Sequence, residues 1–426
     1  MIFLRFIAAD LRRLWLGSFV VVLLISGATG LGLSINLQER ALRLGSARAA
    51  ERFDLVVGAP GGDTQLVLSS VFLQPSPLTL LSGSIFEKLA ADPRVAMAAP
   101  VGFGDSFDGM PIVGTTAELV TDGGKAALAE GRNIETIGEA VIGARVQLAM
   151  GATIKPMHGL AGEGGHTHAE LSYKVVGRMA ATNTPWDRAI LVPIEAVWRL
   201  HHMEARPNYE SGPLQPTANV RAALATAKDD DGDHDHDAPD HLGPPWRNAP
   251  GVPAIFVKAK TIADAYRLRQ EYRTEATLAV FPGEVLARLF ATLGDARAVL
   301  AAVATATQIL VAAAIVLVCV MHLAQRRAQI GALRAFGASR LAVFSLVWIE
   351  MLVLLLLGVA LGIVFGWGGA KLFTAWLART SGVVAPVEFT GEDAAWIAIL
   401  IAAGMVVAAA PAMLAYRGSP AAAMRR

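Results

Sequence analysis

The stretch Met321–Glu350, MHLAQRRAQIGALRAFGASRLAVFSLVWIE, decides how this chain of 426 residues is organised. Apolar runs at 298–321 and 341–370 flank its basic part. Each run is long enough to cross a bilayer, because about 20 residues at 1.5 Å rise span the hydrocarbon core. The connection 322–340 carries four arginines and no acidic residue. The positive-inside rule therefore places this connection in the cytoplasm, between two membrane spans.

The same connection has the apolar spacing of a short amphipathic helix. Ile330, Leu333, Phe336 and Gly337 stand at i, i+3, i+6 and i+7, with arginines on the other side. Gly337 occupies a place where a helix can end, and Ser339 a place where the next helix can be capped. A short helix across the inner ends of two spans predicts a docking surface for a partner.

This segment resembles the cytoplasmic coupling segment of the FtsX/MacB/LolC-type permeases, the four-span membrane subunits of one class of ABC transporter. The motif reads Arg326-Arg327, Gln329-Ile330-Gly331, Leu333-Arg334-Ala335, Phe336-Gly337-Ala338, and it departs from the family at Gln329, where glutamate is usual. The resemblance implies ATPase-coupling roles for Arg326, Arg327, Gln329, Ile330, Gly331, Leu333, Arg334, Phe336 and Gly337.

Composition independently indicates a membrane protein. Hydrophobic residues make up 54% and charged residues 17%, which is too apolar for a soluble chain of this length. The net charge is +1, and the sequence has no basic patch interleaved with aromatics, so nucleic acid is not an expected partner. Cys319 is the single cysteine and lies in a predicted span, so no intrachain disulfide can form.

The N-terminus reads as an uncleaved anchor. Residues 1–13 are amphipathic with three arginines, and 14–37 are free of charge. A cleaved signal peptide is the alternative, with Ser26-Gly27-Ala28 as a weak cleavage site, but its apolar region would be shorter, at about 7–15 residues.

We therefore expect a membrane protein with four transmembrane helices and one large α+β extracytoplasmic domain between spans 1 and 2. It would lie in a bacterial inner membrane, with both termini in the cytoplasm. The expected divisions are a cytoplasmic start (1–13), span 1 (14–37), a MacB-like outer domain (38–297) with a His/Asp-rich insertion (228–248), span 2 (298–321), the coupling segment (322–340), span 3 (341–370), an outer loop (371–393), span 4 (394–416) and a cytoplasmic tail (417–426).

Within the outer domain, short β-branched runs alternate with helix-like segments, which favours an α+β fold. Residues 38–52 and 282–297 are expected to prolong spans 1 and 2 as helical stalks. The predicted strands are 53–59, 109–115, 172–176, 189–192 and 254–257, and the predicted helices are 84–91, 194–201 and 262–273. In span 3, Gly358, Gly362 and Gly366 have small-xxx-small spacing, which permits close helix contact either within one chain or between two.

Histidines are the candidate metal ligands. The stretch 229–241 packs seven aspartates and three histidines into 13 residues, and such donors suit Zn²⁺. A second group lies in the glycine-rich stretch around His166, and His201-His202 at the end of a predicted helix could join it. An acidic loop that only keeps the domain soluble is the alternative. The predicted ligands are His158, His166, His168, His234, His236 and His241.

The sequence contains no Walker A motif, no nucleophile elbow and no HExxH, so we expect a non-catalytic subunit. The resemblance implies a separate MacB/LolD-like ATPase docked under 322–340, a second permease copy or paralogue, and movement passed through the stalks. It implies action on a lipoprotein, peptide, lipid or drug. The alternatives are a zinc-linked version of the same machine and an FtsX-like regulator of a periplasmic partner such as a cell-wall hydrolase.

Overall fold

The structure is a computed structural model, and it divides into two compact units. It describes residues 12, 15–158, 171–201, 249–292 and 337–417, together with 302, 305, 306, 309, 313 and 316. The membrane-helix unit consists of Met1–Leu44, Thr292–Trp376 and Ala385–Arg426, and the outer-domain unit consists of Gly45–Ala291 and Leu377–Val384.

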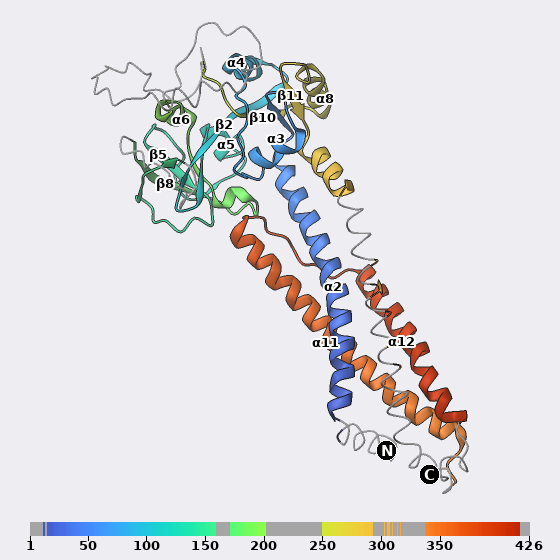
Figure 1. Ribbon diagram of the computed structural model, residues 1–426. Helices are drawn as coiled ribbons and strands as arrows, with labels where there is room; N and C mark the ends of the chain where they lie inside the picture. Colours follow the sequence, from blue (N-terminus) through green and yellow to red (C-terminus); the bar gives the residue numbers. More distant parts are fainter. Residues whose placement is uncertain are drawn as a thin grey trace, which may run out of the picture. The chain divides into compact units, whose positions relative to one another are not determined.

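Three long helices run through the described part of the membrane-helix unit: α2 (Trp15–Glu51), α11 (Arg340–Thr380) and α12 (Gly391–Arg417) (Figure 1). Within the described ranges, these are the helices long and apolar enough to cross a membrane. They contain predicted spans 3 and 4 and all but the first residue of predicted span 1. Predicted span 2, at 298–321, lies almost entirely outside the described residues, so the four-span topology stays a prediction.

Glycines let α2 and α11 approach closely. A Cβ atom added at Gly358 would lie 2.6 Å from the Cβ of Ile25, and one at Gly362 would lie 2.6 Å from the Cβ of Thr29. At Gly366 it would lie 2.7 Å from the carbonyl oxygen of Gly30. The glycine row that the sequence singled out therefore packs against α2 of the same chain.

An ion pair joins α2 to the start of α12. Arg40 donates from Nη1 to Oδ2 of Asp393 at 2.6 Å and from Nη2 to Oδ1 at 3.2 Å. The Asp393 side chain is only 2% exposed. The same carboxylate accepts the backbone N–H of Thr390 at 2.8 Å, which caps the helix. Such two-point pairs fix geometry as well as adding energy.

The outer-domain unit is built on one mixed sheet. Its path in space is β11-β1-β10-β2-β3-β9-β5-β8-β4, with β6 paired to β8 and β7 paired to β2. The strands are β1 (Leu55–Gly58), β2 (Val95–Phe107), β3 (Met110–Thr115), β4 (Leu128–Gly131), β5 (Glu139–Ile142), β6 (Thr153–Ile154), β7 (Met157–His158), β8 (Tyr173–Met179), β9 (Ile190–Pro193), β10 (Ala254–Ala259) and β11 (Leu278–Val280).

The long strand β2 joins the two halves of this sheet. Its first part, Val95–Val101, pairs with β10, and its second part, Gly102–Phe107, pairs with β3. The central strands are buried on both faces, because alternate residues enter different cores: Ile255 and Val257 enter one, and Phe256 enters the other. Burial on both faces explains why these strands read as continuous apolar runs.

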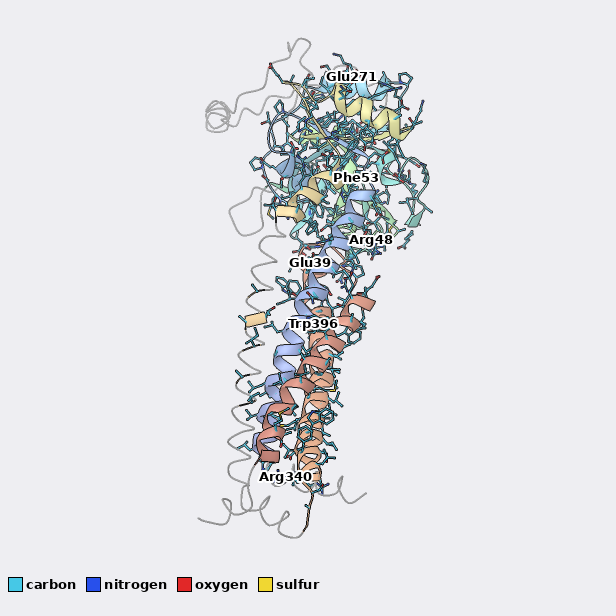
Figure 2. The ribbon with its side chains drawn as sticks, turned by 90° about the vertical axis from the view of Figure 1, so that its right-hand side faces the viewer. Glu39, Arg48, Phe53, Glu271, Arg340 and Trp396 are labelled. Atoms are coloured by element: carbon cyan, nitrogen blue, oxygen red, sulfur yellow. The ribbon has the colours of Figure 1, made fainter. Side chains whose placement is uncertain are left out.

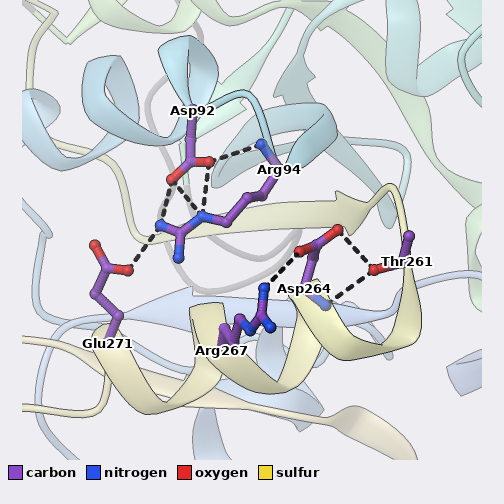
Figure 3. A network of polar contacts seen from close by, with 6 residues as sticks. All are labelled: Asp92, Arg94, Thr261, Asp264, Arg267 and Glu271. Atoms are coloured by element: carbon purple, nitrogen blue, oxygen red, sulfur yellow. Dashed lines mark hydrogen bonds and ion pairs between the residues drawn. The ribbon is translucent and has the colours of Figure 1, made fainter.

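Short helices cover the sheet (Figure 1). Thr261 caps the helix α8 (Ile262–Glu271) by accepting the N–H of Asp264 at 3.1 Å. Arg94 ties the end of α8 to the turn between α4 (Gly83–Ala91) and β2, through Glu271 at 2.7 Å and Asp92 at 2.6 Å (Figure 3). Residues 282–292 are also helical. The others are α3 (Asp63–Ser70), α4 (Gly83–Ala91), α5 (Ala117–Val120), the 3₁₀ turn η1 (Pro185–Arg188), α6 (Ile194–Leu200) and α8 (Ile262–Glu271).

The expected mixture of strands and helices is present, and all five predicted strands and three predicted helices have counterparts. The helical continuation of span 1 through residue 51 is also present. The loop predicted at 371–393 is wrong in its first part, since α11 continues to Thr380. Residues 371–381 contain no glycine or proline, so the helix has no local reason to stop before Gly382, which has a φ of +77°.

The α2–α11 contact predicts a difference between two glycines of the same helix. Gly362→Ala places a methyl group against Thr29, whereas Gly368→Ala meets nothing within 4 Å. Both changes gain the same helix propensity, so their difference reports the contact alone. We expect Gly362→Ala to be less stable than Gly368→Ala by about 1–3 kcal/mol. Thermal unfolding in detergent micelles measures this, and equal stability would contradict the packing described.

Candidate functional site

Both α2 and α11 end within the outer-domain unit, at the same place. Residues of α2 from Gly45 onward belong to that unit, as do Leu377–Val384 at the end of α11. Their contacts meet at the 3₁₀ turn Pro185–Arg188, which we call the anchor segment. Glu39, Arg48 and Phe53 mark the course of the chain along α2 and just past its end (Figure 2).

Aromatic packing holds the end of α2. Phe53 stacks on Phe256 with ring centroids 3.9 Å apart and lies 5.6 Å from the ring of Trp186. Trp186 is fully buried, and its Nε1 donates to the carbonyl oxygen of Val71 at 3.1 Å. The first residues after α2 are thus fixed in the apolar core beneath the anchor segment.

Arg52 adds a cation at this point. Its guanidinium lies 5.8 Å from the rings of Phe53 and Trp186, and Nη2 donates to the carbonyl oxygen of Leu119 at 2.9 Å. Burial lowers the pKa of Arg52, while the charges of Asp122 and Asp187 act in the opposite direction. An arginine keeps its charge even so, because its ordinary pKa lies far above neutral pH.

Backbone hydrogen bonds hold the end of α11. Arg188 donates from Nη1 to the carbonyl oxygen of Thr380, and Arg145 donates from Nη1 to that of Ala378 at 3.2 Å. A Cβ atom at Gly382 would lie 2.9 Å from Cα of Pro185, so the chain passes against the anchor segment itself. The anchor segment therefore contacts the ends of both long helices.

The anchor segment is fixed by a buried carboxylate. Asp187 is 0% exposed and accepts the backbone N–H groups of Thr182 and Asn183 at 2.8 Å each, and the Thr182 hydroxyl at 2.6 Å. Gly143 is required opposite it, since a Cβ atom there would lie 2.4 Å from the carbonyl carbon of Asp187. A buried carboxylate without hydrogen-bond donors would cost free energy. Asp187 therefore keeps its three donors, and the anchor segment is held in one conformation.

The predicted coupling residues are described at one position only. Gly337 has a φ of +95°, the left-handed conformation typical of a helix end. Two residues on, Ser339 Oγ accepts the N–H of Ala342 at 3.1 Å, so the predicted cap at the start of α11 is confirmed. The remaining predicted residues lie outside the described ranges: Arg326, Arg327, Gln329, Ile330, Gly331, Leu333, Arg334 and Phe336.

The predicted metal ligands are likewise mostly outside the described residues, which omit His166, His168, His234, His236 and His241. His158 ends β7, where it is the backbone partner of Asp105 on β2. Among residues with described side chains, no three His, Cys, Asp or Glu side chains gather as a metal site would require.

One polar pair was missed from the sequence. Asp105 is 6% exposed, and its Oδ2 lies 3.1 Å from Nε2 of His201, at the end of α6. Gly104 precedes it with a φ of +155°, and the β2–β3 register shifts between Phe103 and Asp105. Bulges of this kind re-aim side chains, and the Gly-x-Gly-Asp sequence was the available signal.

A small pocket lies beside this pair. It has a volume of about 180 Å³ and is mostly apolar. His201 is its ionisable lining residue. The lining residues are Leu80, Gly102, Phe103, Gly104, Ile194, Val197, Trp198, His201, Gly251 and Pro253.

Comparison with known proteins gives one family match and several distant structural likenesses. Residues 301–420 match the family model described as FtsX-like permease C-terminal. The periplasmic region of MacB from Actinobacillus actinomycetemcomitans is similar at 9% identity and a TM-score of 0.32, covering 56% of this chain and 94% of that one. The extracellular domain of the noncanonic ABC-type transporter YknZ from Gram-positive bacteria is similar at 9% identity and a TM-score of 0.28, covering 53% and 98%. No curated protein matches the sequence.

If the anchor segment holds the end of α2, substitution of Trp186 and substitution of Trp198 should affect that helix differently. Trp186→Ala and Trp198→Ala should each cost about 3–5 kcal/mol, since both rings are buried. Trp186 lies in the same core as Phe53 and contacts its ring, whereas Trp198 lies in the other core. Relative to the sheet amides, hydrogen exchange of the last turn of α2 should therefore quicken in Trp186→Ala and not in Trp198→Ala. The same exchange pattern in both variants would rule out the anchor.

Proposed function

We propose that the chain is the membrane subunit of an ABC transporter of the MacB/LolC/FtsX type, on the ground that residues 301–420 match the family model of the FtsX-like permease C-terminal domain. In this proposal a separate MacB/LolD-like ATPase supplies the energy. The permease passes the resulting movement to its extracytoplasmic domain, which exports or extracts a lipoprotein, peptide, lipid or drug.

The observation that carries the proposal is the continuity of two helices that end on one support. α2 has 37 residues and α11 has 41, which at 1.5 Å rise correspond to about 55 and 60 Å. A bilayer core requires only about 20 residues, so both helices continue well beyond a span. Each ends on the anchor segment Pro185–Arg188, through Phe53 and Thr380 respectively.

Contacts inside the membrane-helix unit would let its helices move together. The glycine contacts join α2 to α11, and the Arg40–Asp393 pair joins α2 to α12. Movement applied at the cytoplasmic start of α11, near Gly337, would pass along a helix without a break until Thr380. An unbroken helix carries displacement because each turn is hydrogen-bonded to the next.

The assembly proposed is a pair of permease chains, as a homodimer or with a paralogue, bound to ATPase subunits in a bacterial inner membrane. Both termini lie in the cytoplasm and the outer domain in the periplasm. The coupling segment 322–340 supplies the ATPase contact, with Phe336 on its apolar face.

Phe336→Asp is predicted to separate the permease from its ATPase. The variant places a charge on the apolar face of the coupling segment, where it would have to be buried in the interface. Ser339→Asp is the matched control, because it adds the same charge nearby while aspartate still caps α11. The ATPase should stop co-purifying with Phe336→Asp and remain bound to Ser339→Asp. Unchanged binding and ATPase stimulation in Phe336→Asp would refute the coupling assignment.

Topology gives a second prediction. In a Cys319→Ser background, Lys125→Cys in the outer domain should react with a membrane-impermeant maleimide in intact spheroplasts, and Ser339→Cys should not. Both side chains are exposed, so accessibility within the protein does not limit either reaction. Labelling of Ser339→Cys from outside would overturn the proposed orientation.

A further inference from the structure

The side chain of Arg40, on α2, binds the chain on both sides of the residue that precedes α12. Its guanidinium donates to the two carboxylate oxygens of Asp393 at 2.6 and 3.2 Å, and to the carbonyl oxygen of Glu388 at 3.1 Å. The exposed carboxylate of Glu392 lies 3.7 Å away. One side chain of α2 therefore holds both the peptide that leads into α12 and the first turn of that helix.

The carboxylate of Asp393 is also fixed within its own segment. It accepts the backbone N–H of Thr390 at 2.8 Å and the Thr390 hydroxyl at 3.1 Å, and its side chain is only 2% exposed. A buried carboxylate is costly unless a positive charge pairs with it. Asp393 therefore needs the guanidinium of Arg40, and that guanidinium is held at the first turn of α12.

An apolar layer belongs to the same part of the unit. Leu33 and Leu37 of α2 are buried with Ala370 of α11, and Val387 and Trp396 pack against them. Glu39 and Trp396 mark the region on α2 and α12 in Figure 2. Apolar contacts of this kind supply packing, whereas a two-point ion pair also fixes the geometry between two groups.

Stability alone is a poor reason for a buried ion pair. The cost of removing two charges from water offsets much of their attraction, and apolar residues of similar size often replace such a pair without loss of stability. The best-attested role of buried polar and ionic groups is to fix the register of the elements that carry them.

We propose that Arg40 is a positioning residue, which through Asp393 fixes the axial register of α2 against α12. The two helices then move as one body when ATP-driven displacement reaches either of them. α2 continues without a break from Arg40 to Glu51, so it carries that displacement to its end. This inference deepens the proposed function, and its ATP-dependent part rests on that function.

The test measures the distance between α2 and α12 in the full-length chain. Spin labels are attached to Leu44→Cys on α2 and Ala395→Cys on α12, both at exposed positions, in a Cys319→Ser background that has no other cysteine. Labelled chains are diluted with unlabelled ones, so that double electron resonance reports distances within one chain. We expect one narrow distance in the permease alone, and the same distance in its ATPase complex without nucleotide and with ATP and vanadate.

Arg40→Gln should abolish the single narrow distance, because the carboxylate of Asp393 loses its counter-charge. Arg43→Gln is the matched control. It makes the same change one turn away, where the ion pair is with Glu39 of the same helix, and it should leave the distance as in the parent. Arg40→Lys keeps the charge without the two-point geometry, so its distribution should lie between those of the parent and Arg40→Gln.

A double variant separates register from stability. Arg40→Met with Asp393→Asn removes both charges, and the asparagine oxygen still accepts the N–H of Thr390. We expect this variant to unfold at the temperature of the parent and to lose the single narrow distance. It also keeps the test valid if Arg40→Gln fails to fold.

Two outcomes would overturn the inference: a narrow distance retained in the double variant, or a parent distance that changes when ATP and vanadate are added. Co-purification of the ATPase is scored on the same samples. Its absence from the parent would count against the proposed function, whereas the distances in the permease alone would still decide whether Arg40 sets the register.

Discussion

The buried carboxylate of Asp187 is the contact on which the outer domain depends. It accepts three hydrogen bonds from Thr182 and Asn183 in a site closed to solvent. The residue before it, Trp186, packs against the end of α2, and the residue after it, Arg188, binds the end of α11. Loss of this one charge would leave several buried donors unpaired and free the segment that supports both helices.

The forces that stabilise the outer-domain unit differ from those that stabilise the membrane-helix unit. In water, apolar burial drives assembly, and the outer domain accordingly has two cores, one on each face of its sheet. In lipid there is no comparable drive between helices, and close van der Waals contact replaces it. Gly358, Gly362 and Gly366 provide that contact.

Local sequence patterns predicted those parts of the fold that local energetics determine. Apolar runs gave the long helices, and β-branched runs gave strands such as β1, β9 and β10. Strand β2 escaped prediction because Pro100, Gly102 and Gly104 interrupt its pattern. Contacts between distant positions have no local signature.

The Asp105–His201 pair shows this limit most clearly, since its members are 96 positions apart and neither residue type is unusual where it stands. The anchor segment could not be predicted for the same reason, because it depends on contacts between distant parts of the chain. Its sequence, Pro-Trp-Asp-Arg, signals a turn, but nothing in it indicates that two long helices would end there. The coupling segment, by contrast, was predicted from a contiguous motif, and its contact with an ATPase stays a prediction.

The assignment of Leu377–Val384 to the outer-domain unit has a consequence for how that domain can be isolated. A soluble fragment cut at Gly45 and Ala291 would lack this return peptide, although it would contain every strand of the sheet. Arg145 and Arg188 would lose the main-chain oxygens that they bind, and Pro185 would lose its cover at Gly382. The folded domain is not a continuous piece of the chain. An isolated domain with all of its contacts would therefore need the peptide 377–384 joined to it through a linker, as in a circular permutant.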